Sequence, residues 1–138
     1  MAPWEEILGH VSERPPTGFQ KDITAVPSIL PAIRRDLDRL LDGELVQMQR
    51  VWDIRLAVTE ACANAVLHAY SAGEPGTVHV AAEVSADTLV VAVRDHGRGI
   101  TDTRSGQGVG MGLMRSLADT LEVHDVDPGV LVRMRFLF

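Results

Sequence analysis

A long run of apolar residues at helical spacing in the middle of the chain constrains the fold most. Its members follow one another at three- and four-residue steps: Val51, Ile54, Val58, Cys62, Ala65 and Ala69. This is the spacing of one face of an α-helix. The pattern therefore predicts a helix over about residues 47–69, with its apolar face turned toward the core of a folded domain.

Shorter apolar patterns lie on both sides of this helix. The spacing over 30–41 predicts another helix, with Pro31 tolerated in its first turn and Asp42 and Gly43 ending it. A third helix is predicted over 111–121. Runs of apolar residues bounded by turn residues predict strands, with a hairpin turn at 85–87 and a buried strand at 89–93. The predicted strands cover 18–25, 78–82, 89–93, 123–126 and 130–138.

The first seventeen residues read as a separate arm. Trp4, Ile7, Leu8 and Val11 stand at helical spacing, and the pair of prolines at 15–16 interrupts the pattern. We expect residues 1–17 to form a short helix or a partly ordered arm, followed by a single domain over 18–138.

Composition excludes several classes of protein. The chain has 138 residues, 46% of them hydrophobic, which is the size of one domain with its own core. The formal charge of −6 argues against direct nucleic-acid binding. The longest apolar run, 89–93, is far shorter than the roughly 20 residues of a membrane-spanning helix, and residues 1–6 lack the features of a signal peptide. Cys62 is the single cysteine and cannot form an internal disulfide, which fits a protein of a reducing compartment. Its place in the apolar pattern fits a small core residue. We therefore expect a cytoplasmic protein that does not bind membranes.

Polar side chains on the central helix form a second, chemical pattern. Glu60, Asn64 and His68 are each four residues apart and therefore stack along one side of the helix. A carboxylate can accept a proton, and an amide oxygen is a hard ligand suited to Mg²⁺. The pair suits phosphoryl transfer. On spacing alone, Glu60 and Asn64 also fit the solvated face of an amphipathic helix, and His68 fits a capping or packing residue.

Two glycine clusters follow the polar helix. Asp95 stands at the end of a predicted strand, where its carboxylate can accept a hydrogen bond from an exocyclic amine. Gly97 and Gly99 would let the chain turn beside a base, and the glycines over 108–112 would bring backbone N–H groups to phosphates at a helix start. Two ordinary turns are the alternative. Neither cluster has the spacing of a Walker A or a Rossmann motif.

Three segments in this order resemble known sequence boxes. RLAVTEACANAVLHAY, VRDHGRGI and GVGMGLMRSLAD resemble the N box and the two glycine boxes of the GHKL ATPase superfamily. Within it, the chain is similar to the anti-sigma-factor serine kinases of the SpoIIAB and RsbW type over about residues 20–138. The resemblance implies an α+β fold: a two-layer α/β sandwich whose mixed, mainly antiparallel sheet has helices packed on one face.

The resemblance also implies roles for single residues, with ATP and Mg²⁺ as cofactors. Glu60 would be the general base, Asn64 the magnesium ligand, and Asp95 the group that reads the adenine amine. The remaining nucleotide-binding residues would be His68, Gly97, Gly99, Ile100, Gly108, Val109, Gly110, Met111, Gly112 and Leu113.

The partners implied are a sigma factor, which the protein would sequester, and an anti-anti-sigma protein with a STAS domain, which it would phosphorylate on serine. A homodimer is also implied. Two features depart from the family pattern: the segment between Gly99 and Gly108 is short, and Val130 and Leu131 stand where relatives usually place a threonine. The alternatives are a catalytically weak or inactive binding module and, less well supported, a detached histidine-kinase ATPase domain.

Overall fold

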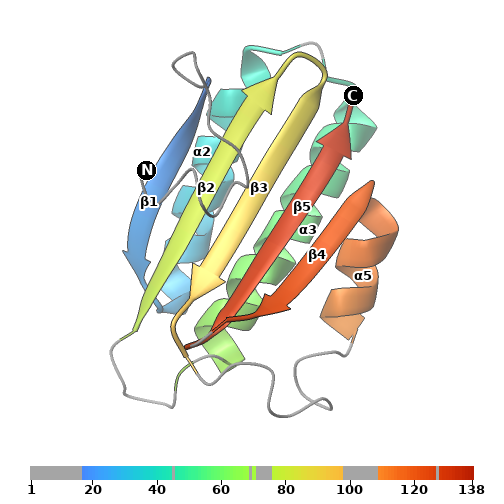
Figure 1. Cartoon of the computed structure of the whole chain (residues 1–138). Helices are drawn as coiled ribbons and strands as arrows, with labels where there is room; N and C mark the ends of the chain where they lie inside the picture. Colours follow the sequence, from blue (N-terminus) through green and yellow to red (C-terminus); the bar gives the residue numbers. More distant parts are fainter. Residues whose placement is uncertain (1–16, 45, 69, 71–75, 98–108, 127) are drawn as a thin grey trace.

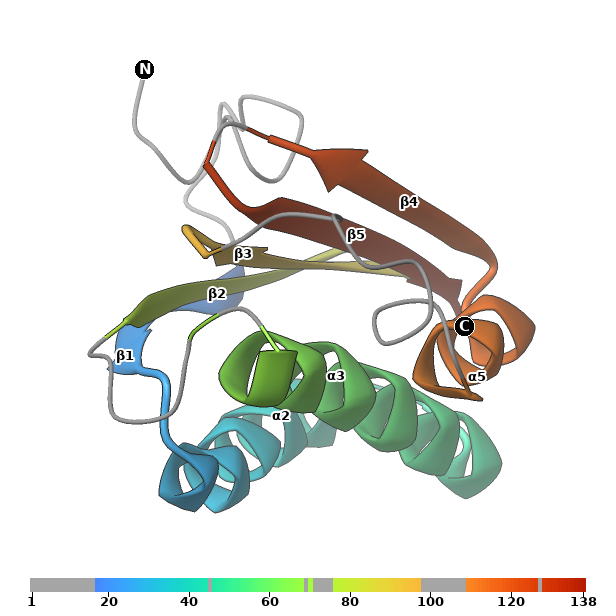
Figure 2. The same cartoon turned by 90° about the horizontal axis from the view of Figure 1, so that it is seen from below.

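A five-stranded sheet with helices on one face forms the body of the protein (Figure 1, Figure 2). The computed structural model describes residues 17–44, 46–68, 70, 76–97, 109–126 and 128–138. The predicted arm over 1–17 therefore lies outside the described residues except for Thr17. The elements are β1 (Thr17–Thr24), the 3-10 helix η1 (Pro27–Ile29), α2 (Leu30–Asp42), α3 (Met48–His68), β2 (Thr77–Ser85), β3 (Thr88–Asp95), α5 (Val109–Leu117), β4 (Thr120–Asp125) and β5 (Val130–Leu137).

The strands are ordered β1-β2-β3-β5-β4, and every pairing among the described residues is antiparallel. The helices α2, α3 and α5 all cover the same face of this sheet (Figure 2). This arrangement confirms the expected α+β fold with helices on one side. The strand predicted over 18–25 is β1, which lies at one edge of the sheet.

The central strand β3 is buried along its apolar run. All residues over 89–93 are buried, and β3 pairs with β2 on one side and with β5 on the other. The β2–β3 hairpin turns at Ala86 and Asp87, between the paired residues Ser85 and Thr88. The buried strand and the hairpin are therefore both confirmed.

The main core lies between the helices and the sheet. On α3, Ile54, Val58 and Cys62 are fully buried, as the apolar spacing predicts. Burial raises the pKa of the Cys62 thiol to about 12, so this cysteine is a small core side chain with little thiolate character at neutral pH. Buried residues from the other elements complete this core, among them Ile33, Leu37, Leu41, Val80, Val91, Met114, Met134 and Phe136.

The predicted helix over 111–121 is wrong at its end. Helix α5 stops at Leu117, and Leu121 lies in β4, paired with Met134 of β5. Leu117 and Leu121 stand four residues apart and therefore mimic helical spacing. After Ala118, the N–H of Asp119 donates to the carbonyl of Arg135, 2.9 Å away, so pairing with β5 replaces the helical bonds.

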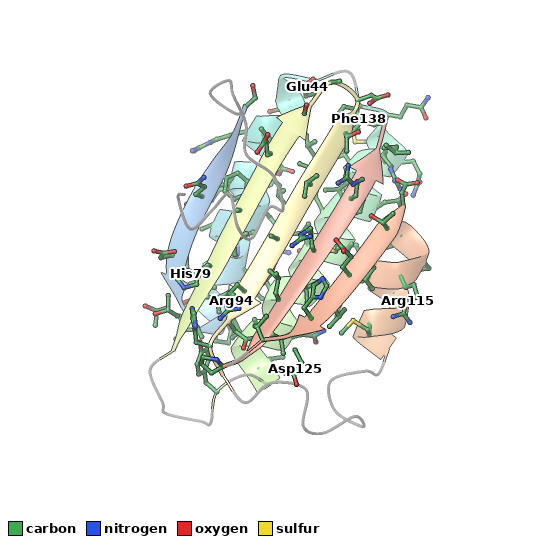
Figure 3. All side chains as sticks on the ribbon, in the orientation of Figure 1. Glu44, His79, Arg94, Arg115, Asp125 and Phe138 are labelled. Carbon is green, nitrogen blue, oxygen red and sulfur yellow. The ribbon has the colours of Figure 1, made fainter. Side chains whose placement is uncertain are left out.

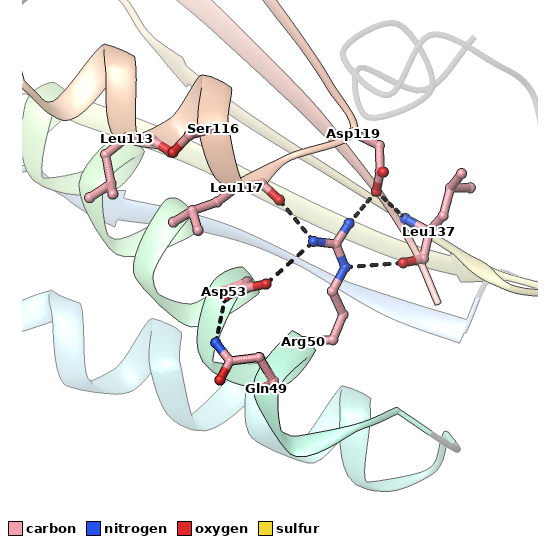
Figure 4. Close-up of polar contacts among 8 residues, drawn as sticks. All are labelled: Gln49, Arg50, Asp53, Leu113, Ser116, Leu117, Asp119 and Leu137. Carbon is pink, nitrogen blue, oxygen red and sulfur yellow. Dashed lines mark hydrogen bonds and ion pairs between the residues drawn. The ribbon is translucent and has the colours of Figure 1, made fainter.

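Arg50 of α3 fixes the end of α5 to the rest of the fold (Figure 4). Its guanidinium donates to the carbonyl of Leu117 at 2.8 Å and to that of Leu137 at 3.0 Å, and it forms an ion pair with Asp119. The same Asp119 oxygen accepts the N–H of Leu137 at 2.7 Å. One side chain thus joins α3, α5 and β5.

None of the described helices has an apolar stretch of the length that a bilayer crossing requires.

Candidate functional site

The elements that carry the predicted motifs meet at one end of the molecule. The C-terminal half of α3, the C-terminal end of β3 and the N-terminal end of α5 all lie at this end (Figure 1). The fold therefore brings together the segments with Glu60 and Asn64, with Asp95, and with Gly110 and Gly112, which are distant in the sequence.

Asp95 is the most constrained polar residue at this end. It is the last residue of β3 and only 6% exposed. Its Oδ1 accepts the N–H of Gly97 at 2.9 Å and the N–H of Val130 at 3.3 Å. Burial raises the pKa of this carboxyl, although the two backbone hydrogen bonds and the nearby His96 and Arg94 act in the opposite direction. Among the described residues, no hydrogen bond reaches the second oxygen, Oδ2.

Gly129 makes this arrangement around Asp95 feasible. Its φ of +103° is in the region that favours glycine. A Cβ at this position would lie 2.1 Å from the backbone oxygen of Asp95 and 2.8 Å from its Oδ1. The turn between β4 and β5 therefore closes directly against Asp95. Sequence reasoning missed this contact, because a Pro-Gly pair between strands signals only a turn.

Glu60 and Asn64 lie on α3, one turn apart, and both are half-buried. Within the described part of the chain, neither side chain has a hydrogen bond or an ion pair. Asn64 can offer one hard oxygen, and Mg²⁺ typically takes one or two protein ligands and completes its shell with waters and phosphates. No group of three or more potential metal ligands gathers among the described residues. That finding is compatible with magnesium held mostly by a nucleotide.

The second glycine cluster forms the first turn of α5 rather than a loop that precedes the helix. Helix α5 begins at Val109, so Gly110, Met111 and Gly112 are helical. Gly112 is exposed, and a Cβ there would meet nothing within 4 Å. The first N–H groups of a helix lack partners within the helix and favour anions. The helix thus begins two residues earlier than predicted, and its first turn can present N–H groups to a phosphate.

The structure describes some of the other predicted nucleotide-binding residues but not all of them. Met111 packs against the main core. Leu113 is half-buried, and its carbonyl accepts the Ser116 hydroxyl at 2.9 Å (Figure 4). His68 is the last residue of α3. The predictions for Gly99, Ile100 and Gly108 fall on residues outside the described ones.

A polar cluster beside Asp95 was not foreseen from the sequence. The N–H of His96 donates to the Tyr70 hydroxyl at 2.9 Å, and the Nε2 atoms of His96 and His79 are 2.8 Å apart. The Tyr70 hydroxyl in turn donates to the carbonyl of Thr77 at 2.6 Å. Desolvation, Arg94 and His79 lower the pKa of His96. Figure 3 shows His79 and Arg94 together at this end of the sheet. Pairing of β2 with β3 creates the cluster, so no local sequence signal marks it.

The chain is similar in sequence to known proteins. The family model of the histidine kinase-like ATPase domain matches residues 23–136. The chain is 33% identical over 127 residues to serine-protein kinase RsbW of Bacillus licheniformis, covering 80% of this chain and 79% of that relative. It is 28% identical over 102 residues to anti-sigma F factor of Clostridium perfringens, covering 64% and 73%.

A solved structure shares the fold. A crystal structure of RsbU and RsbW domains from Mycobacterium tuberculosis superimposes with a TM-score of 0.67 and 21% identity. The match covers 86% of this chain and 32% of that one, so the chain spans about a third of the larger protein. With the family model covering most of its length, the chain belongs to the histidine kinase-like ATPase domain family.

Proposed function

We propose that this protein is an ATP-dependent protein-serine kinase that also acts as an anti-sigma factor. The observation that carries the proposal is the meeting of Glu60 and Asn64, Asp95 and the first turn of α5 at one end of the fold. The names of its relatives, serine-protein kinase RsbW and anti-sigma F factor, support the same function.

In this proposal Asp95 recognises the adenine base. The hydrogen bonds from Gly97 and Val130 hold Oδ1 in place, and Oδ2 is then available to accept a hydrogen bond from the exocyclic amine. Burial strengthens such a hydrogen bond, because the competing water is excluded. Gly97 and the segment over 98–100 would line the base.

The phosphates would lie at the N-terminal end of α5. The N–H groups of its first turn and the helix dipole favour negative charge there, and the open space beside Gly112 leaves room for close approach. Asn64 would hold the magnesium ion through its amide oxygen. His68, Gly108, Val109 and Leu113 would complete this part of the site.

Glu60 would act as the general base. ATP, when bound, supplies the phosphoryl group. Glu60 takes the proton of a serine hydroxyl on the partner as the serine oxygen forms its bond to phosphorus, while the bond between phosphorus and the leaving oxygen of ADP breaks. The partner in this proposal is an anti-anti-sigma protein with a STAS domain, and a homodimer in the cytoplasm is the working form.

The test is phosphate transfer to a purified STAS-domain protein with labelled ATP and Mg²⁺. The native chain is expected to transfer phosphate, and Glu60→Gln to lose at least about 100-fold of the rate, the usual size of general-base catalysis. The matched control is Glu44→Gln, because Glu44 lies at the opposite end of the molecule (Figure 3). Equal rates for native protein and Glu60→Gln would remove Glu60 from the mechanism.

A second candidate is a binding module without catalysis. The short segment between Gly99 and Gly108 favours it. Val130 also favours it, because Val130 donates its backbone N–H to Asp95 but lacks the side-chain hydroxyl that a threonine would bring to the adenine site. Calorimetric titration with ATP separates the two functions. Sigma-factor binding that needs no nucleotide, together with no phosphate transfer, would support the binding module.

A further inference from the structure

The face of the sheet opposite the helices carries its own buried apolar cluster, which we call the outer-face cluster. It consists of Ala81, Val90, Ala92 and Leu131, with exposed fractions of 0%, 6%, 0% and 8%. Partly buried Val126 packs against it. An apolar cluster with so little exposed surface is shielded from water, and that shielding needs a cover.

Strand geometry places these side chains away from the helices. Neighbouring residues on a strand point to opposite faces. Val80 and Ala82, on either side of Ala81, belong to the core under the helices, so Ala81 points outward. Ala92 is the cross-strand partner of Ala81 and therefore points outward too.

The described helices do not supply that cover. Helices α2, α3 and α5 all lie on the other face (Figure 2). Glu83, two residues beyond Ala81 on the same strand and the same face, is also only 6% exposed. The shielding thus extends beyond the apolar residues to a carboxylate.

We propose that residues 1–16 dock on this face and cover the outer-face cluster. These residues are attached at Thr17, where β1 begins next to β2. Their apolar members, Trp4, Ile7, Leu8 and Val11, have the spacing of one helical face. The role of this segment as an intramolecular cover goes beyond the kinase and anti-sigma function and does not depend on it.

The length of the segment fits the distance to be crossed. Ala92 lies on β3, two strands from β1, which is about 10 Å at the usual strand spacing. A helix over residues 3–14 would be about 18 Å long. The prolines at 15–16 end such a helix and leave the chain free to turn before it enters β1. The segment is therefore long enough to reach the cluster.

Trp4 provides a direct reporter, because the chain has only one other tryptophan, Trp52. Trp52 is on α3 and 56% exposed, so Trp52→Phe leaves the core intact and makes Trp4 the sole tryptophan. In this variant we expect the fluorescence emission maximum of Trp4 to lie at a shorter wavelength in native buffer than in denaturant. We also expect iodide to quench Trp4 less in native buffer than in denaturant. Emission and quenching equal to those of a free tryptophan amide would overturn the proposal.

Two charged variants in the Trp52→Phe background test the surface and the segment separately. Val90→Asp on the outer face and Leu8→Asp in the segment are each expected to shift Trp4 emission to the red and increase quenching. Met48→Asp, on the exposed helix side, is the control and should change neither. Leu8→Asp changes no residue of the described fold, so it decides the question if Val90→Asp fails to fold by circular dichroism.

Concentration distinguishes the segment's own chain from a second copy. Docking within one chain predicts Trp4 emission that is constant over a wide dilution series, with a constant mass by light scattering. A blue shift that disappears on dilution, in step with loss of a dimer, would show that a second copy provides the cover. No red shift in Leu8→Asp would overturn the proposal as well.

Discussion

Replacing Arg50 by methionine should destabilise the protein by about 3 kcal/mol, because one side chain joins three elements. Methionine keeps much of the aliphatic stem but removes every donor. The ion pair with Asp119 is partly exposed and contributes at most about 1 kcal/mol. Each of the two hydrogen bonds to carbonyls of Leu117 and Leu137 contributes about 1 kcal/mol. The sum corresponds to a fall of about 10 °C in the melting temperature of a domain of this size.

The assay is urea unfolding followed by circular dichroism, with Arg115→Met as the matched control. Arg115 is exposed on α5 itself (Figure 3), so its loss should change the free energy of unfolding by no more than about 0.5 kcal/mol. A double-mutant cycle with Asp119→Asn should give a coupling energy of about 1 kcal/mol. A loss below about 1 kcal/mol for Arg50→Met would refute the view that this arginine holds the end of α5 in place.

Three further predictions follow from single positions. The thiol of Cys62, with its pKa raised to about 12, should react with an aromatic disulfide reagent only after unfolding, and fast reaction in native buffer would contradict its place in the core. Gly129→Ala should cost at least about 2 kcal/mol in urea unfolding, because its φ and the overlap with Asp95 forbid a Cβ; a fully stable variant would refute that contact. Since the folded-state pKa of Asp95 is raised above its unfolded value, its contribution to stability is present below the unfolded pKa and lost as pH rises through the folded pKa. Asp95→Asn should therefore flatten the pH dependence of unfolding and gain stability relative to the native chain toward pH 7, and an unchanged profile would show that burial does not govern this carboxyl.

Local patterns were sufficient to predict most elements. The apolar spacing on α3 and the buried run on β3 reflect packing that leaves a mark on consecutive residues. The end of α5 was not predictable, because Leu117 and Leu121 have helical spacing while β-pairing with Met134 decides the conformation of Leu121. In that competition the tertiary contact outweighs the local preference.

The site was predictable in composition but not in detail. Glu60, Asn64 and Asp95 stand in recognisable patterns, and the fold brings their elements to one end. The contacts of Gly129 and Val130 with Asp95 depend on β3 pairing with β5, more than thirty residues away along the chain. The shielding of Ala81 from water also could not be predicted. An apolar run on a central strand indicates burial on both faces but does not indicate which segment covers each face.

We propose that one end of this fold binds ATP with magnesium through Asp95 and Asn64. Calorimetric titration of the full chain with ATP measures this binding. Such a site predicts binding of one ATP per chain that weakens when Mg²⁺ is removed. It also predicts at least a tenfold loss of affinity, about 1.4 kcal/mol, in Asp95→Asn and no loss in Glu44→Gln. No detectable binding to the native chain, or equal affinity in native protein and Asp95→Asn, would contradict it.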